Sequence, residues 1–158
     1  MASKRASRLA AGGAVAAAFF TFLVGWEGLR LTPYFDVVGV KTWCAGETQG
    51  TPKARYTLEE CRDITVKAAE RYAKPVEDCI TRPMPDTVFI AFVSLAYNIG
   101  HTGFCRSNVA FLYNKGLHKQ ACDAMLAYNK GGRPKREIKG LTNRRHAERK
   151  LCLQGANL

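Results

Sequence analysis

The chain has few residues arranged as metal or nucleotide ligands. None of its six cysteines forms a Cys-x-x-Cys pair, and its three histidines lie near no cysteine at the spacing of a zinc site. A glycine-rich phosphate loop and a Ser/His/Asp set are also missing. We therefore expect neither a metal nor another cofactor.

Acidic residues are scarce, with 13 against 24 lysines and arginines, giving a net charge of +11. The excess lies at the ends: Lys4, Arg5 and Arg8 at the N-terminus, and nine basic residues against two acidic ones from Lys130 onward. Such ends attract polyanions, although a solvated surface that keeps the protein soluble is an equal alternative. Without a helix-turn-helix, zinc-finger or RNP-like pattern, we do not expect a nucleic-acid partner.

No cysteine precedes residue 44, and the six that follow are widely spaced. An even number with wide spacing favours three disulfides in an oxidising compartment over buried thiols in the cytosol. Sequence leaves fifteen pairings open. We predict that neighbours pair, as Cys44–Cys61, Cys79–Cys105 and Cys122–Cys152.

Residues Leu9 to Gly25 form an uncharged run of 17, rich in alanine and glycine, behind the basic N-terminus. Its length is at the lower edge of what spans a bilayer. The preceding positive charges would keep the N-terminus in the cytoplasm. A cleaved signal peptide is the alternative, but Leu23 stands where cleavage needs a small residue, so an uncleaved membrane segment is favoured.

After this segment the pattern predicts an α+β domain. Glycines and Pro52 interrupt short β-prone runs between Tyr34 and Tyr56, which indicates a hairpin or a three-stranded sheet. Thr57 and Glu60 form a capping box for a helix that we expect to end near Lys74, ahead of Pro75. Further helices are expected at 87–100 (capped by Asp86), 107–115, 118–129 and from Leu141 or Thr142. The helix at 87–100 is apolar on nearly all sides, so it should be central and buried.

Two carboxyl groups and a hydroxyl follow the apolar run at fixed spacing: Glu27, Asp36 and Thr42. Pro33 and Gly39 make the chain turn between them, so the two acids can lie on different elements and face one another. Cleavage of a glycosidic bond requires such a pair, one acid protonated near the leaving oxygen and one ionised near the anomeric carbon.

This motif, read as WEG, YFDVVGVKT and WCAG, resembles the phage-type lysozymes related to T-even phage lysozyme (glycoside hydrolase family 24). Two later stretches, VSLAYNIG (93–100) and GLTNRRHAERKLC (140–152), carry the same resemblance. The chain departs from the family at Glu47, where a histidine is usual. The uncleaved N-terminal segment is similar to that of signal-anchor-release endolysins.

The resemblance implies an α+β lysozyme-like fold in which a long helix joins a small β lobe to a mostly helical lobe. It implies an endolysin that causes host cell lysis by hydrolysing the β-1,4 bond between N-acetylmuramic acid and N-acetylglucosamine in peptidoglycan. Glu27 would be the general acid, Asp36 the base or an electrostatic stabiliser, and Thr42 the residue that orients water. Asn98 would line the substrate cleft, although a helix-capping role is nearly as plausible. The family favours inversion of configuration.

The expected organisation is an anchor at residues 1–25 and a catalytic domain at 26–158. Host secretion machinery would export the chain to the inner membrane, with its domain in the periplasm, before release as a monomer. The basic helix containing Arg144, Arg145, Arg149 and Lys150 would then meet anionic envelope groups. A lytic transglycosylase, or a membrane-tethered basic binding protein without catalysis, are the alternatives.

Overall fold

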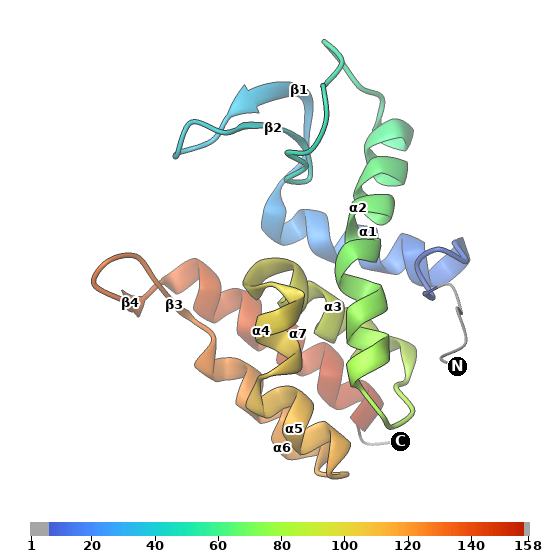
Figure 1. The fold of residues 1–158 in the computed structure, drawn as a ribbon, viewed down its shortest axis with the longest axis vertical. Coiled ribbons are helices and arrows are strands. Elements are labelled where there is room, and N and C mark those ends of the chain that lie inside the picture. Colours follow the sequence, from blue (N-terminus) through green and yellow to red (C-terminus); the bar gives the residue numbers. More distant parts are fainter. Residues whose placement is uncertain (1–6, 157–158) are drawn as a thin grey trace. The chain divides into compact units, whose positions relative to one another are not determined.

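A computed structural model of the protein describes residues 7–156. The chain forms two compact units, Met1–Arg71 and Tyr72–Leu158, and the division falls within helix α2. Helices and two small antiparallel sheets make up the structure, which confirms the α+β class (Figure 1). Lys4 and Arg5, expected to orient the chain in a membrane, lie outside the described residues.

Helix α1, Gly13–Glu27, contains most of the uncharged run. Its end is set by Gly28, whose φ of 76° is in the region that favours glycine and whose N–H donates to Val24 O at 3.0 Å. The helix buries Ala16, Phe19, Phe20 and Leu23. Among residues 7–156, no helix combines the length and apolar character needed to cross a membrane.

A β-hairpin follows α1, as the sequence predicts. Strand β1, Arg30–Phe35, pairs with β2, Lys41–Cys44, in a register that places Tyr34 opposite Thr42. A third strand is represented by a single bridge between Trp43 and Glu47. A small core beneath the hairpin contains Trp43, Cys44, Tyr56 and Cys61, and the Cys44–Cys61 disulfide joins β2 to α2.

Helix α2, Leu58–Cys79, begins with the predicted capping box. Thr57 Oγ accepts from Glu60 N at 3.1 Å, and Glu60 Oε2 accepts from Thr57 N at 2.8 Å. The expected end near Lys74 is wrong, because the helix continues through Pro75. Burial of Val76 and the Cys79–Cys105 disulfide stabilise the last turn although proline removes one helical hydrogen bond.

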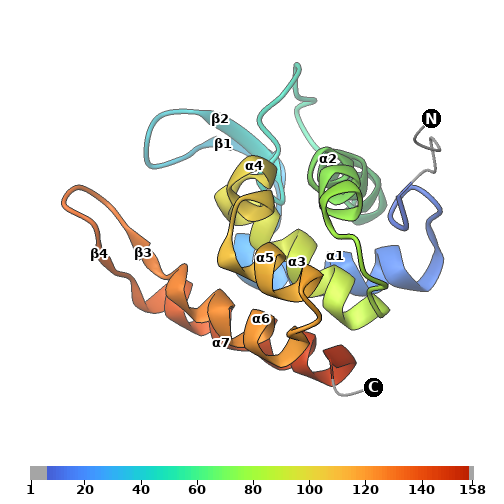
Figure 2. The same ribbon diagram turned by 60° about the horizontal axis from the view of Figure 1, so that its bottom comes forward.

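The second unit is built around helices α3, Asp86–Ile99, and α7, Lys139–Ala156, which pack against one another (Figures 1 and 2). Nine consecutive residues of α3, from 88 to 96, are buried, which confirms the prediction of a central helix. The helices approach closely at Gly155, where a Cβ would lie 2.6 Å from Thr87 Oγ1. The Cys122–Cys152 disulfide joins α6 to α7, so all three predicted pairings are confirmed.

Short elements complete this unit: α4 (His101–Cys105), α5 (Asn108–Asn114), α6 (His118–Ala124), a 3-10 turn (Met125–Ala127), β3 (Lys130–Gly131) and β4 (Arg136–Glu137). The helix expected at 118–129 thus ends early, and the last helix starts before the predicted residue. The β3–β4 hairpin was not predicted; its loop contains a cis peptide bond between Arg133 and Pro134. Figure 2 shows this hairpin extending from the start of α7.

Candidate active site

Glu27 is the last residue of α1, and its side chain is half-buried. It lies one helical turn after Leu23, which is completely buried. Because Gly28 ends the helix, the chain can turn immediately into β1 at Arg30. The position of Glu27 therefore depends on the packing of α1.

Asp36 occupies the loop of the β1–β2 hairpin and organises it. Its Oδ1 accepts hydrogen bonds from Val38 N at 2.9 Å and Val40 N at 2.8 Å. The backbone closes the same loop, since Asp36 N donates to Val40 O at 2.9 Å and Gly39 N donates to Asp36 O at 3.0 Å. An aspartate that accepts from the amide two residues on forms an Asx turn, so the loop itself fixes the orientation of this carboxylate.

Thr42 lies on β2, immediately after the pair Phe35–Lys41 that closes the loop. Its side chain is buried, and Oγ1 donates to Val40 O at 3.0 Å. With its hydrogen directed at that carbonyl, the hydroxyl oxygen keeps its capacity to accept a hydrogen bond. Val40 thus contacts both residues, through its amide to Asp36 and through its carbonyl to Thr42. The structure brings Glu27, Asp36 and Thr42 into the same unit.

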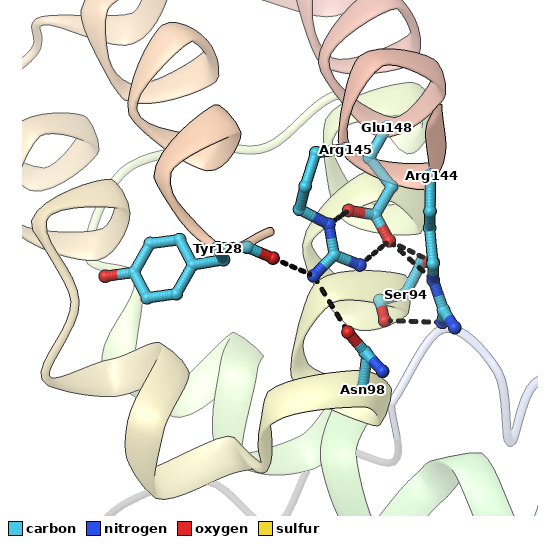
Figure 3. Close-up of polar contacts among 6 residues, drawn as sticks. All are labelled: Ser94, Asn98, Tyr128, Arg144, Arg145 and Glu148. Carbon is cyan, nitrogen blue, oxygen red and sulfur yellow. Dashed lines mark hydrogen bonds and ion pairs between the residues drawn. The ribbon is translucent and has the colours of Figure 1, made fainter. Parts of the chain in front are cut away.

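Asn98 belongs to the second unit, near the end of α3. Its side chain is exposed, and Oδ1 accepts from Arg145 Nη1 at 2.9 Å. This bond joins Asn98 to a buried ionic network that sequence reasoning missed (Figure 3).

Glu148 is the centre of that network and is completely buried, as is Arg145. Its Oε1 accepts from Ser94 Oγ at 2.7 Å, Arg145 Nη2 at 2.8 Å and Arg144 Nε at 3.1 Å. Its Oε2 lies 2.7 Å from Arg145 Nε. The arginines also reach backbone carbonyls, those of Ser94 and Tyr128.

The expectation of a solvent-facing cationic helix is therefore wrong for two of its four residues. Arg144 and Arg145 are buried, and Arg149 is paired with Asp123 at 2.7 Å. One sequence signal was available: Ser94 interrupts an otherwise apolar stretch of a buried helix, and a hydroxyl in such a place requires a polar partner.

Glu47, which replaces the family's usual histidine, accepts hydrogen bonds from the backbone after β2. It is buried, and its Oε1 accepts from Thr48 N and Gln49 N, both at 2.8 Å. Arg71 on α2 lies 3.5 Å from the same oxygen and also donates to Gln49 Oε1. The Glu47 carboxylate therefore stabilises the turn at residues 47–49. Within residues 7–156, no group of three or more His, Cys, Asp or Glu side chains is placed to hold a metal ion.

The α+β fold, with a small hairpin following a helix and a second, mostly helical unit, is that of the lysozyme class. The family model described as "Phage lysozyme" matches residues 24–148, and the chain belongs to this family. A SAR-endolysin of Pseudomonas phage phiKMV is 36% identical over 146 residues, covering 90% of each chain.

Among solved structures, the active form of the P1 phage endolysin Lyz matches with a TM-score of 0.80 and 25% identity, covering 92% of this chain and 89% of the other. The secreted inactive form of that endolysin matches with a TM-score of 0.52 and 23% identity, covering 72% and 79%. The protein therefore has the lysozyme fold and is a glycosidase acting on peptidoglycan. Its fold agrees better with the active form.

Proposed function

We propose that the protein is an endolysin and that Glu27, Asp36 and Thr42 hydrolyse the β-1,4 bond between N-acetylmuramic acid and N-acetylglucosamine. Glu27 donates its proton to the glycosidic oxygen as the bond from that oxygen to the anomeric carbon breaks. Asp36 takes a proton from a water that Thr42 orients, and the water adds to the anomeric carbon from the opposite face. The products are a sugar hydroxyl and a hemiacetal of inverted configuration.

The observation that carries this assignment is the organisation of the hairpin loop. Two amides hold one oxygen of Asp36, and Val40 links that carboxylate to the hydroxyl of Thr42. A base and a water-orienting group that are fixed by the same short loop need little rearrangement when substrate binds. Asn98, which Arg145 orients, is proposed as a substrate contact from the second unit.

Replacing Glu27 by glutamine tests the acid. Glu27→Gln should reduce clearing of purified peptidoglycan by at least about a hundredfold, because proton donation contributes roughly 10²–10⁴ in rate. Glu137→Gln, on the exposed strand β4, is the matched control and should clear at the wild-type rate. A Glu27→Gln protein that is folded, by circular dichroism, and fully active would rule out the assignment.

Product analysis separates hydrolysis from the action of a lytic transglycosylase. Hydrolysis leaves a reducing N-acetylmuramic acid end, whereas a transglycosylase leaves an anhydro end. A transglycosylase needs one glutamate and no aspartate, so the ordered position of Asp36 favours hydrolysis. Asp36→Asn should therefore lose most activity. Anhydro products from the wild type would make the transglycosylase the correct function.

We further propose that residues 1–25 are an uncleaved anchor, exported by host secretion machinery, and that residues 26–158 are the catalytic domain. The domain would lie in the periplasm, with the N-terminus in the cytoplasm, until the anchor leaves the inner membrane and the protein becomes a soluble monomer. Two observations support this: relatives bear the description SAR-endolysin, and Leu9, Phe19 and Leu23 are buried within the protein. The segment thus has two environments, lipid before release and the protein core after it.

Tethering would also restrain catalysis, because Glu27 lies two residues beyond the anchor. While the anchor spans the bilayer, Glu27 stays at its surface; after release, α1 folds and carries Glu27 to its site. Comparing the purified full chain with residues 26–158 tests this role. The full chain should clear peptidoglycan and the truncated one should not. Equal activity would mean that the segment exports and tethers but has no part in the active fold.

A further inference from the structure

The loop of the β1–β2 hairpin, residues 35–40 and here called the hairpin tip, exposes several apolar side chains. The exposed fractions are 70% for Phe35, 103% for Val37, 77% for Val38 and 43% for Val40. Single exposed apolar residues are ordinary, but four within six consecutive positions form a patch of the kind that marks a binding surface. The remaining positions are Asp36 and Gly39.

Most amides of the tip already donate hydrogen bonds within the loop. The amides of Asp36, Val38, Gly39 and Val40 all donate within the loop, two of them to the carboxylate of Asp36. In a lipid environment each unsatisfied amide costs several kcal/mol, so a loop that enters the edge of a bilayer must satisfy its own. This loop does so for those four amides, and its apolar side chains are exposed.

The residues around the tip suit the surface of an anionic membrane. Arg30 and Lys41, both exposed, lie on the two strands of the hairpin, and Trp26 is 36% exposed directly after the apolar segment. Exposed apolar side chains accompanied by tryptophan and basic residues are typical of segments that bind at the membrane–water interface. The opposing charge in the tip, Asp36, is held by the loop's own amides.

Chain length identifies which membrane the tip can reach. The apolar segment ends at Gly25 and the tip begins at Phe35, ten residues later. Ten residues span at most about 36 Å when fully extended. A domain tethered by the segment therefore keeps the hairpin tip within reach of the lipid headgroups.

We propose that the hairpin tip is a membrane-contact surface that inserts into the outer face of the inner membrane while the protein is tethered. Asp36 and Thr42 then face the bilayer and are withheld from peptidoglycan. This inhibition acts through the hairpin and adds to the inhibition that results from holding Glu27 at the membrane surface. The proposal rests on the proposed anchor role of residues 1–25. The experiment below measures vesicle binding and peptidoglycan clearing separately, so failure of lipid binding can be distinguished from failure of catalysis.

Vesicles of phosphatidylethanolamine and phosphatidylglycerol provide the test, with the purified full chain and co-sedimentation as the readout. The double variant Val37→Ser/Val38→Ser should bind about tenfold more weakly, in line with the apolar area removed. Phe111→Ser, equally apolar and 59% exposed on α5, is the matched control and should bind as the wild type does. Helix α1 is the same in all three proteins, so its own affinity for lipid cancels.

A gain of binding is tested with a second variant, whose fold is checked by circular dichroism. Val38→Trp should bind vesicles several-fold more tightly, because a tryptophan side chain favours the interface. The same vesicles should slow peptidoglycan clearing by the wild type more than by the double variant, each relative to its own rate without lipid. Clearing without lipid measures the lysozyme function alone.

Three results would overturn the proposal. The double variant and Val38→Trp could bind vesicles as the wild type does, which would leave the tip without a role in lipid binding. The double variant could lose retention on purified peptidoglycan and keep its affinity for vesicles, which would make the tip a glycan contact. Sedimentation could reveal a dimer that the double variant dissociates, which would make the tip a self-association surface.

Discussion

Replacing Glu148 by glutamine tests the largest electrostatic feature of the second unit. The substitution keeps the size of the side chain and removes the charge that faces two arginines, whose side chains are 5% and 0% exposed. Breaking a buried ion pair by removing one partner costs about 3–5 kcal/mol, because the remaining charge is buried without compensation. Most of the stability of a domain of this size can be lost in this way.

Urea unfolding measures the effect. With a slope of about 2 kcal/mol per molar urea, the Glu148→Gln midpoint should fall by roughly 1.5–2.5 M. The matched control is Asp123→Asn, which removes the ion pair between Asp123 on α6 and Arg149, the residue after Glu148 on α7. That pair is partly solvated, with side chains 48% and 34% exposed, so its loss should cost less than about 1 kcal/mol.

A compensating variant isolates the physical cause. Replacing Arg144 and Arg145 by methionine together with Glu148 by leucine removes all three charges at once, and apolar groups often substitute for a buried ionic cluster without loss. The triple variant should therefore recover part of the stability lost by Glu148→Gln. Equal midpoint shifts for Glu148→Gln and Asp123→Asn would refute the reasoning, since the network would then contribute no more than a surface pair.

Three further predictions concern the first unit. Leu23→Ala should lower the free energy of unfolding by about 3 kcal/mol and slow peptidoglycan clearing, because a cavity in the face of α1 displaces Glu27 one turn away. Thr57→Ala should cost about 1 kcal/mol in urea unfolding, since it removes the N-cap of α2. The hydrogen bond from Lys53 to Glu60, and then that from Thr57 N, lowers the pKa of Glu60. Its contribution to stability is therefore present above the unfolded-state pKa and lost as the pH falls through the folded one, so Lys53→Met should flatten the acid side of a stability–pH curve.

Matched variants make these outcomes decisive. Thr21→Ala, on the exposed face of α1, should change neither stability nor clearing, and Thr48→Ala should leave urea unfolding unchanged. A Leu23→Ala protein that is less stable but fully active would separate the packing of α1 from the position of Glu27. An unchanged pH dependence in Lys53→Met would show that Lys53 does not govern the ionisation of Glu60.

The features predicted correctly from sequence are those determined by neighbouring residues. The capping box of Thr57 and Glu60 closes across three positions, and the hairpin loop is fixed by Asp36 and the amides that follow it. Each of these interactions can be read from a short stretch because both partners lie within it.

The features that were missed depend on partners far apart in sequence. Glu148 meets Ser94 across 54 positions, and this contact draws Arg144 and Arg145 into the interior. Pro75 is accommodated within α2, where the Cys79–Cys105 disulfide joins residues 26 apart. The motif of Glu27, Asp36 and Thr42 supplied the candidate site residues. Their spacing in the sequence, however, contains no information on the distance between the two carboxyl groups.

The two halves of the proposed site are stabilised in different ways, and this difference suits the delayed activity proposed above. Asp36 and Thr42 lie on a hairpin organised by its own hydrogen bonds and joined to α2 by the Cys44–Cys61 disulfide. Glu27 ends helix α1, which is positioned by burial of apolar residues such as Phe19 and Leu23. Those same residues would favour a lipid environment, so under the proposed anchor role the membrane would compete for α1 and leave the hairpin folded. The hairpin that carries the proposed base and water-orienting group would then be folded before release, and withdrawal of its tip from the membrane together with the arrival of α1 and Glu27 would complete the site.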